Sequence, residues 1–237
     1  MKLIFLFIIL ALTACKKQQV AVIDLPPLPT NQTITAKKFS YLALGDSYTI
    51  GQNVSTGNTF PAQLSKSLNA NNFTADPLTI IARTGWTTAD LIGSIKSQNI
   101  TQKFDIVTLL IGVNNQFRGY SQTTYRQEFV ELLSSALNFA NGDKNKVFVL
   151  SIPDWGVTAY AQGYDRAQIA REIDAFNAIN KEETLKAGIS YVDITPISKM
   201  ASGDLSLIAD DGLHPSGKMY GLWVEQLSPK VLIQLKK

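Results

Sequence analysis

Five short segments rich in valine, isoleucine and leucine recur along the chain, and longer stretches with helical periodicity separate them. The apolar segments span residues 39–44, 78–82, 106–112, 147–152 and 189–194. Strands buried on both faces have continuous apolar sequences, and regular alternation with helices indicates parallel strands joined by right-handed crossovers. The sequence therefore predicts a three-layer α/β/α sandwich with a five-stranded parallel sheet.

Two of the intervening helices are clearly marked in the sequence. Residues 165–188 begin with an aspartate suited to capping, carry apolar residues at helical spacing and end with a glycine. Residues 124–140 repeat this design: Thr124 and Gln127 predict a capping box, and Asn141-Gly142 predicts the end of the helix. These helices supply two of the predicted crossovers.

The first residues of the chain predict a secretory signal. Residues 1–14 hold one lysine and a long apolar run, and Leu12-Thr13-Ala14-Cys15 resembles the lipobox of bacterial lipoproteins. We expect a lipoprotein signal peptide over 1–14 and a diacylglycerol anchor on Cys15, which would hold the protein at a membrane of the bacterial cell envelope. A plain signal peptide with an incidental cysteine is the alternative.

The rest of the chain predicts one tethered domain. Residues 15–38 are polar, contain prolines and show no period, so they predict a flexible tether. Residues 39–237 are numerous enough for one domain with a substantial core. Cys15 is the only cysteine, so no disulfide is expected. The net charge of +3 and the absence of a dense basic cluster in that domain give no support for nucleic-acid binding.

The loops that follow the predicted strands carry polar residues of the types found in catalytic sites. In a parallel α/β sheet the ligand crevice lies outside the carboxyl ends of the strands, so these loops should meet. In chain order they contain Gly45-Asp46-Ser47-Tyr48, Arg83-Thr84-Gly85-Trp86, Gly112-Val113-Asn114-Asn115, Pro153-Asp154-Trp155-Gly156 and Asp211-Gly212-Leu213-His214-Pro215.

Ser47 and His214 are the natural candidates for a nucleophile and its base. A serine hydroxyl needs a base to take its proton, and His214 is the only histidine in the chain. A carboxylate that orients the ring is expected from Asp211, with Asp210 as the adjacent competitor. Alternatively, one of these aspartates only caps the last helix, which Pro215 is well placed to start.

Negative charge on a tetrahedral intermediate needs fixed hydrogen-bond donors, and three are available. Ser47 and Gly85 can offer backbone N–H groups, and Asn114 can offer its side-chain amide. We expect these three groups to form an oxyanion hole.

Taken together, these motifs resemble the SGNH hydrolases, also called GDSL esterases and lipases. The resemblance extends from about residue 39 to the end of the chain and lies in Gly45-Asp46-Ser47, Gly85, Gly112-x-Asn114 and Asp211-x-x-His214, which occur in the family's order. Tyr48 replaces the leucine of the GDSL motif, and Asn115 stands where the family usually has aspartate. The resemblance implies a flavodoxin-like fold and a serine esterase.

The expected activity is therefore hydrolysis of a carboxylic ester through an acyl-serine intermediate, without a metal or other cofactor, and the expected substrate is a short acyl or acetyl ester of a lipid, a glycan or a small molecule. The alternatives are acyl transfer by the same residues, or a surface lipoprotein that binds a ligand without turnover. Aromatic residues in or near the loops could form an acyl pocket or stack on a sugar, so we expect Trp86 and Trp155 to contact the substrate. The other candidates are Phe117, Tyr120, Tyr160 and Tyr164.

Overall fold

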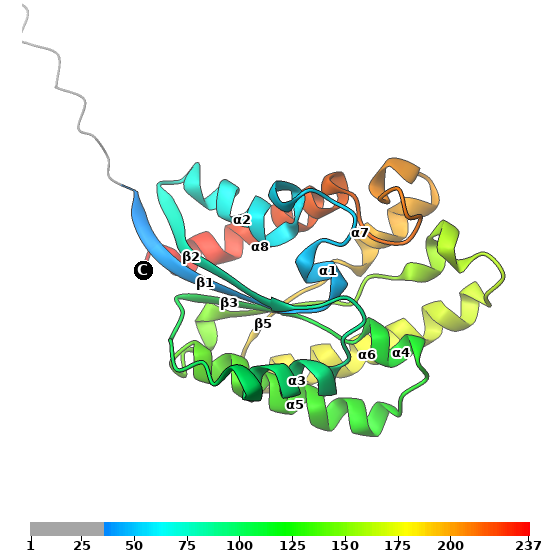
Figure 1. Cartoon of the computed structure of the whole chain (residues 1–237), viewed down its shortest axis with the longest axis horizontal. Helices are drawn as coiled ribbons and strands as arrows, with labels where there is room; N and C mark the ends of the chain where they lie inside the picture. Colours follow the sequence, from blue (N-terminus) through cyan, green and yellow to red (C-terminus); the bar gives the residue numbers. More distant parts are fainter. Residues whose placement is uncertain (1–35) are drawn as a thin grey trace, which may run out of the picture. The chain divides into compact units, whose positions relative to one another are not determined.

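The computed structural model describes residues 36–237, which form a parallel sheet with helices on both faces (Figure 1). The strands are β1 (Lys37–Gly45), β2 (Phe73–Ala82), β3 (Ile106–Leu110), β4 (Val147–Leu150) and β5 (Ser190–Val192). They pair in the order β2-β1-β3-β4-β5, and every pairing is parallel. The predicted α/β/α sandwich with a five-stranded sheet is confirmed.

The predicted signal peptide, the predicted lipidation site Cys15 and most of the predicted tether lie outside the described residues. β1 begins at Lys37, so the last two residues of the predicted tether belong to the sheet. β2 begins five residues earlier than predicted, at Phe73. Its first half lies at the edge of the sheet and is partly exposed, so this half lacks the apolar run by which a buried strand is recognised.

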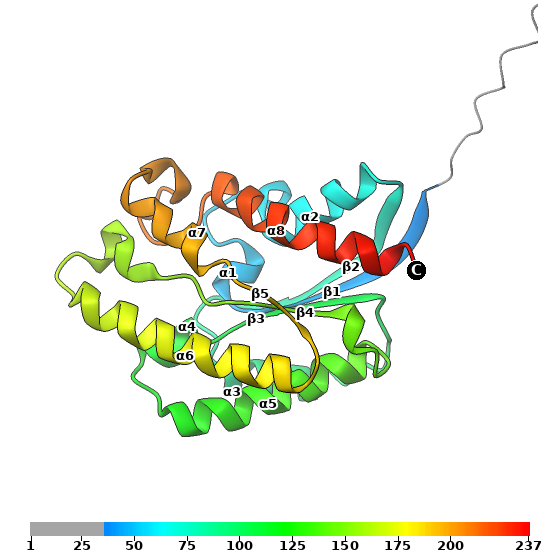
Figure 2. The same cartoon turned by 180° about the vertical axis from the view of Figure 1, so that it is seen from behind.

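Long helices cover the two faces of the sheet (Figures 1 and 2). On one face α2 (Phe60–Asn69) packs against α8 (Gly217–Leu235). On the other face α5 (Gln122–Phe139) packs against both α3 (Thr88–Gln98) and α6 (Arg166–Lys186). The core lies between these layers, and β3 and β4 are buried along their whole length.

Short helices and 3-10 turns occupy several of the connections. They are α1 (Ser47–Ile50), α4 (Val113–Phe117), α7 (Thr195–Lys199), η1 (Thr56–Asn58), η2 (Lys144–Lys146), η3 (Trp155–Val157), η4 (Ala159–Ala161), η5 (Met200–Ser202) and η6 (Leu205–Leu207). Several of them directly follow the carboxyl end of a strand, so they carry the loops singled out in the sequence.

The two predicted helices are present, and one of their predicted caps is wrong. Asp165 caps α6 by accepting a hydrogen bond from Gln168 N at 2.9 Å. In contrast, α5 begins two residues before Thr124, and Ser121 is its N-cap. Because Thr124 already lies in the first turn of α5, the predicted capping box with Gln127 does not form.

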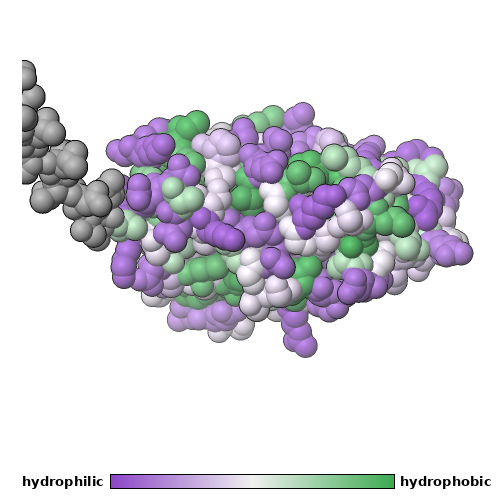
Figure 3. Space-filling model, turned by 90° about the horizontal axis from the view of Figure 1, so that it is seen from above, coloured by the Kyte–Doolittle hydropathy of each residue, from purple (hydrophilic) through white to green (hydrophobic). Residues whose placement is uncertain are grey.

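The surface over α2 and α8 is mixed in character. Figure 3 shows hydrophobic side chains in separate small groups among hydrophilic ones. Exposed apolar residues such as Leu205 and Ile233 are of this kind, and isolated ones are normal on a protein surface. Among the described helices, none is both long and apolar enough to cross a bilayer.

Gly45 is required where β1 meets β3 and α1. A Cβ at this position would overlap the carbonyl oxygen of Leu110 and the hydroxyl of Thr49. Gly45 is needed for this close approach and not for a left-handed backbone, because its φ lies outside that region. The contact brings the end of β1 tightly against the end of β3.

We expect Gly45→Ala to lower the free energy of unfolding by about 1–3 kcal/mol, because the added methyl group meets backbone atoms that have little room to move. Gly93→Ala is the matched control: Gly93 lies inside α3 with open space around it, so alanine should stabilise the helix by about 0.5–1 kcal/mol. Urea unfolding of both variants measures the difference. Equal effects of the two substitutions would contradict the close contact.

Candidate active site

Ser47 lies just past the carboxyl end of β1, the strand between β2 and β3. The Asp46 carboxylate accepts a hydrogen bond from Tyr48 N at 3.0 Å, which caps the short helix α1 and ends the strand. Ser47 is the first residue of α1 and is 4% exposed. The Gly-Asp-Ser turn therefore places Ser47 at the end of the sheet where the strands have their carboxyl ends.

A cavity of about 160 Å³ lies beside Ser47 and is formed by the loops that follow four of the strands and by the loop before α8. The residues that line it are Ser47, Tyr48, Thr84, Gly85, Val113, Asn114, Phe117, Trp155, Tyr160, Leu213 and His214. Of the two tryptophans predicted to contact substrate, Trp155 lines the cavity and Trp86 does not. Tyr120 and Tyr164 also lie outside it.

His214 and Asp211 form a close pair in the loop before α8. His214 Nδ1 lies 2.6 Å from Asp211 Oδ2, and the other carboxylate oxygen accepts the backbone N–H groups of Leu213 and His214 at 3.0 Å each. Since a carboxylate only accepts hydrogen bonds, Nδ1 carries the proton of this contact, and in the neutral imidazole Nε2 is then the nitrogen with a free lone pair. Nε2 makes no hydrogen bond within residues 36–237, and the ring lines the same cavity as Ser47.

The competing assignments for the aspartates do not match this geometry. Asp210 is exposed and makes no hydrogen bond to any described residue. The last helix, α8, begins at Gly217, and its N-cap is Ser216, whose hydroxyl accepts from Met219 N at 3.4 Å. Pro215 therefore precedes the cap, and neither aspartate caps the helix.

Two neighbours of the histidine pair were not expected from the sequence. The Asn53 side-chain amide donates to Asp211 Oδ2, the same oxygen that accepts from His214. The Tyr48 ring lies 5.6 Å from the His214 ring and is itself buried. Asn53 is more than 150 residues away in sequence and belongs to none of the recognised motifs, so only the folded structure reveals its contact.

The two aspartates near the site have opposite electrostatic environments. Burial favours protonation of Asp211, but hydrogen bonds from the His214 ring and from backbone N–H groups outweigh it and lower its pKa to about 2. Burial raises the pKa of Asp46 to about 7, although Tyr48 N donates to it. Asp46 Oδ2 has no hydrogen-bond partner among the described residues. Asp211 is thus an anion at neutral pH, whereas Asp46 titrates near neutrality.

Gly85 and Asn114 line the same cavity as Ser47. Asn114 Nδ2 donates to the carbonyl of Trp86 at 2.9 Å, which fixes the amide beside the loop after β2. Gly85 has a φ of +80°, a conformation that favours glycine, and neither its N–H nor that of Ser47 donates to a described residue. The three predicted oxyanion donors therefore lie around one cavity.

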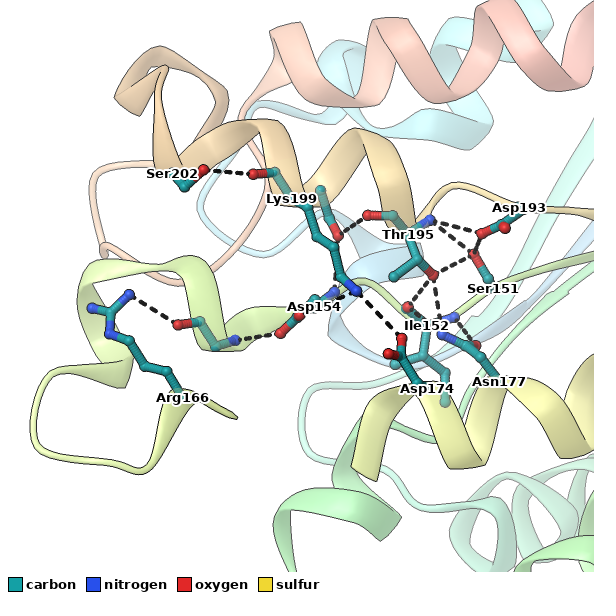
Figure 4. Close-up of polar contacts among 12 residues, drawn as sticks. Ser151, Ile152, Asp154, Arg166, Asp174, Asn177, Asp193, Thr195, Lys199 and Ser202 are labelled. Carbon is teal, nitrogen blue, oxygen red and sulfur yellow. Dashed lines mark hydrogen bonds and ion pairs between the residues drawn. The ribbon is translucent and has the colours of Figure 1, made fainter. Parts of the chain in front are cut away.

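The loop after β4 carries Trp155 and is held from two sides (Figure 4). The Asp154 carboxylate accepts from Gly156 N at 2.8 Å and lies 3.8 Å from Lys199 Nζ. On the other side the Arg166 guanidinium donates to the carbonyls of Gly156 and Thr158 at 2.9 and 3.0 Å. These contacts fix the part of the cavity wall that this loop supplies.

The sequence matches the model of the GDSL-like lipase/acylhydrolase family over residues 43–222. The chain belongs to this family, as its SGNH motifs predicted, and it is a serine hydrolase that acts on ester bonds. No curated protein matches the sequence significantly.

Solved structures of other proteins share this fold. The lipase/acylhydrolase from Enterococcus faecalis is 19% identical, with a TM-score of 0.63 over 83% of this chain and 96% of that chain. The psychrotrophic esterase EstA from Pseudoalteromonas sp. is 15% identical, with a TM-score of 0.62 over 84% and 99%. A mutant of Axe2, an acetyl-xylooligosaccharide esterase from Geobacillus Stearmophilus, is 18% identical, with a TM-score of 0.63 over 83% and 96%. At this identity the likeness shows the fold alone.

We expect Asp46 to make the folded state less stable as the pH rises from about 4 to about 7. Over this range its buried carboxyl keeps a proton that the unfolded chain has released, so the folded state binds more protons. Asp46→Asn cannot ionise, so the variant should gain stability relative to the wild type as the pH rises. Urea unfolding of both proteins between pH 4 and pH 8 measures this difference.

Asp211→Asn is the control, because the pKa of Asp211 is lowered and not raised. Its stabilising contribution is present above the unfolded pKa and is lost as the pH falls through about 2, so the stability difference between the wild type and Asp211→Asn should stay nearly constant from pH 4 to pH 8 and change only at acid pH. A constant difference between the wild type and Asp46→Asn from pH 4 to pH 8 would contradict the raised pKa of Asp46.

Proposed function

We propose that the protein hydrolyses short-chain carboxylic esters through an acyl intermediate on Ser47. The observation that carries this proposal is the His214–Asp211 pair, whose free ring nitrogen and the Ser47 hydroxyl belong to one cavity. A serine, a base and an orienting carboxylate are the three parts that nucleophilic ester cleavage needs.

In this mechanism the Ser47 hydroxyl attacks the ester carbonyl while His214 Nε2 takes its proton. The ionised Asp211 stabilises the imidazolium that forms, and His214 then gives the proton to the leaving alcohol. The Ser47 and Gly85 N–H groups and the Asn114 amide donate to the oxyanion. Water, activated by His214, attacks the acyl-serine by the same path and releases the acid.

The size of the cavity favours a short acyl group. At about 160 Å³ it is smaller than the roughly 300–1,000 Å³ that drug-sized ligands occupy. Its wall includes Phe117, Trp155 and Leu213, which suit a small apolar group such as acetyl. The structural neighbour Axe2 is an acetyl-xylooligosaccharide esterase, and an acetyl group agrees with this cavity size.

The nucleophile and the partner of His214 are tested by three variants. We expect Ser47→Ala to lower p-nitrophenyl acetate hydrolysis by several orders of magnitude, and Asp211→Asn by up to about 10⁴-fold, because the ring loses the carboxylate that fixes its tautomer. Asp210→Asn is the matched control and should retain full turnover, since Asp210 makes no contact with the ring. The measurements are kcat with acetyl to octanoyl esters and the thermal midpoint of each variant.

Each outcome of this series assigns a role. Full activity in Ser47→Ala would overturn the proposed nucleophile. A loss confined to Asp210→Asn would show that Asp210, and not Asp211, orients the ring. A lower thermal midpoint with unchanged kcat in Asp211→Asn would reduce the role of Asp211 to structure.

We also propose that the protein is a bacterial lipoprotein of the cell envelope, anchored through Cys15. The support is the sequence Leu12-Thr13-Ala14-Cys15 at the end of the apolar run. We expect Cys15→Ser to abolish incorporation of labelled fatty acid and to release the protein from the membrane fraction. Membrane association that persists in this variant would contradict the proposed anchor.

A further inference from the structure

Four aromatic rings form one cluster beside the cavity. We call Phe117, Trp155, Tyr160 and Tyr164 the aromatic ridge. Their ring centroids lie 5.2–6.5 Å apart in every pairing, and the Tyr160 and Tyr164 rings are stacked with an interplanar angle of 18°. Trp155 is buried, whereas the other three rings are 45–49% exposed. The ridge therefore offers ring faces to a ligand at little entropic cost, because its rings already support one another.

A second cavity lies against the ridge and shares part of its wall with the first. It has a volume of about 230 Å³, and Phe117 and Trp155 line both cavities. We call this second cavity the outer cavity; Tyr164 lines it and does not line the cavity beside Ser47. A ligand that crosses the ridge would therefore contact both cavities at once.

The far wall of the outer cavity is a chain of hydrogen bonds. Trp155 Nε1 donates to Gln116 Oε1 at 2.8 Å, and Gln116 Nε2 donates to Glu172 Oε2 at 2.7 Å. Gln168 Nε2 donates to the other oxygen of Glu172 at 2.8 Å. Each carboxylate oxygen accepts one amide N–H and has capacity for more. Glu172 forms no ion pair with the described residues, so its remaining lone pairs suit neutral donors such as hydroxyl groups.

The outer cavity thus combines aromatic faces with fixed acceptors of hydroxyl protons. A fatty chain would cover the remaining lone pairs of the Glu172 carboxylate without donating to them, which is unfavourable. A phosphate group would be repelled by Glu172 and by Asp165, which also lines the cavity. A sugar matches both the aromatic and the polar parts of the wall. Its C–H face packs on an aromatic ring, and its hydroxyl groups donate to the carboxylate and amide oxygens.

From this complementarity we propose that the alcohol part of the substrate is a carbohydrate chain, whose sugar units bind in the outer cavity across the aromatic ridge. The ester group lies in the cavity of Ser47 and His214, and a further sugar unit of the same chain contacts Tyr164 and Glu172. This proposal rests on the proposed ester hydrolysis, and it makes the aromatic ridge and Glu172 determinants of specificity.

The test compares acetylated xylo-oligosaccharides of one to four units with p-nitrophenyl acetate, which lacks a sugar, using the full-length protein. We expect kcat/KM to rise from the monosaccharide to the longer chains. In Tyr164→Ala and Glu172→Gln the ratio of kcat/KM for the tetrasaccharide to that for p-nitrophenyl acetate should fall about tenfold, mainly through KM, since one stacking or hydrogen-bonding contact is lost.

Two matched variants control for nonspecific effects. Tyr120 is exposed to a similar degree as Tyr164 but lines neither cavity, and Glu225 is an exposed carboxylate on α8. Tyr120→Ala and Glu225→Gln should keep the wild-type ratio of the two kcat/KM values. An equal ratio in all four variants, or faster hydrolysis of phosphatidylcholine vesicles than of any acetylated sugar, would overturn the proposed carbohydrate site.

A binding experiment separates failure of this inference from failure of the proposed function. Isothermal titration of Ser47→Ala with unacetylated xylotetraose needs no turnover. We expect binding that weakens about tenfold when Tyr164→Ala is added, even if the wild type hydrolyses no ester. Absence of binding, or binding that is insensitive to Tyr164→Ala, would overturn the inference while leaving hydrolysis of p-nitrophenyl acetate unaffected.

Discussion

The site depends on the position of β1 between β2 and β3 in a parallel sheet. The connection after β1 passes over one face of the sheet through α2 towards β2, and the connection after β3 passes over the other face through α5 towards β4. Chains that leave neighbouring strands in opposite directions open a crevice at their carboxyl ends. Ser47 follows β1 directly, so the fold itself places this hydroxyl in the crevice. The close contact between Gly45 and the end of β3 keeps the edges of the crevice together.

The crevice also sets the charges of the two aspartates that flank it. Asp46 is fully buried between the end of β1 and the start of α1, where burial disfavours its ionised form. Asp211 lies at the rim, where three N–H donors from residues 213 and 214 and the Asn53 amide stabilise its anion. The Asp46 carboxyl group therefore stabilises the backbone turn after β1, and the Asp211 carboxylate hydrogen-bonds the His214 ring. Neighbouring acids of one site commonly divide their roles in this way, through environment and not through residue type.

The sequence predicts the layers, the sheet and the residues around the cavity because each of these depends on local pattern. Buried parallel strands are apolar throughout, and the residues that follow them must meet at one edge. The first half of β2 escapes this reasoning because it is an exposed edge. The contacts of Asn53 with Asp211 and of Gln116 with Trp155 escape it because they join residues far apart in sequence. Trp86 and Trp155 follow strands in the same manner, and only packing distinguishes the one that lines the cavity.

The loop after β4 is anchored to the rest of the fold at its base. Its stem is fixed by the Ser151 hydroxyl, which accepts from the N–H groups of Ile194 and Thr195 at 2.7 and 3.0 Å, so the loop is anchored to the end of β5 (Figure 4). Trp155 lies just beyond this stem and belongs to the aromatic ridge, whereas Ser47 and His214 belong to other elements. Under the proposed function, substitutions on the ridge would therefore alter which alcohols fit without moving Ser47 or His214.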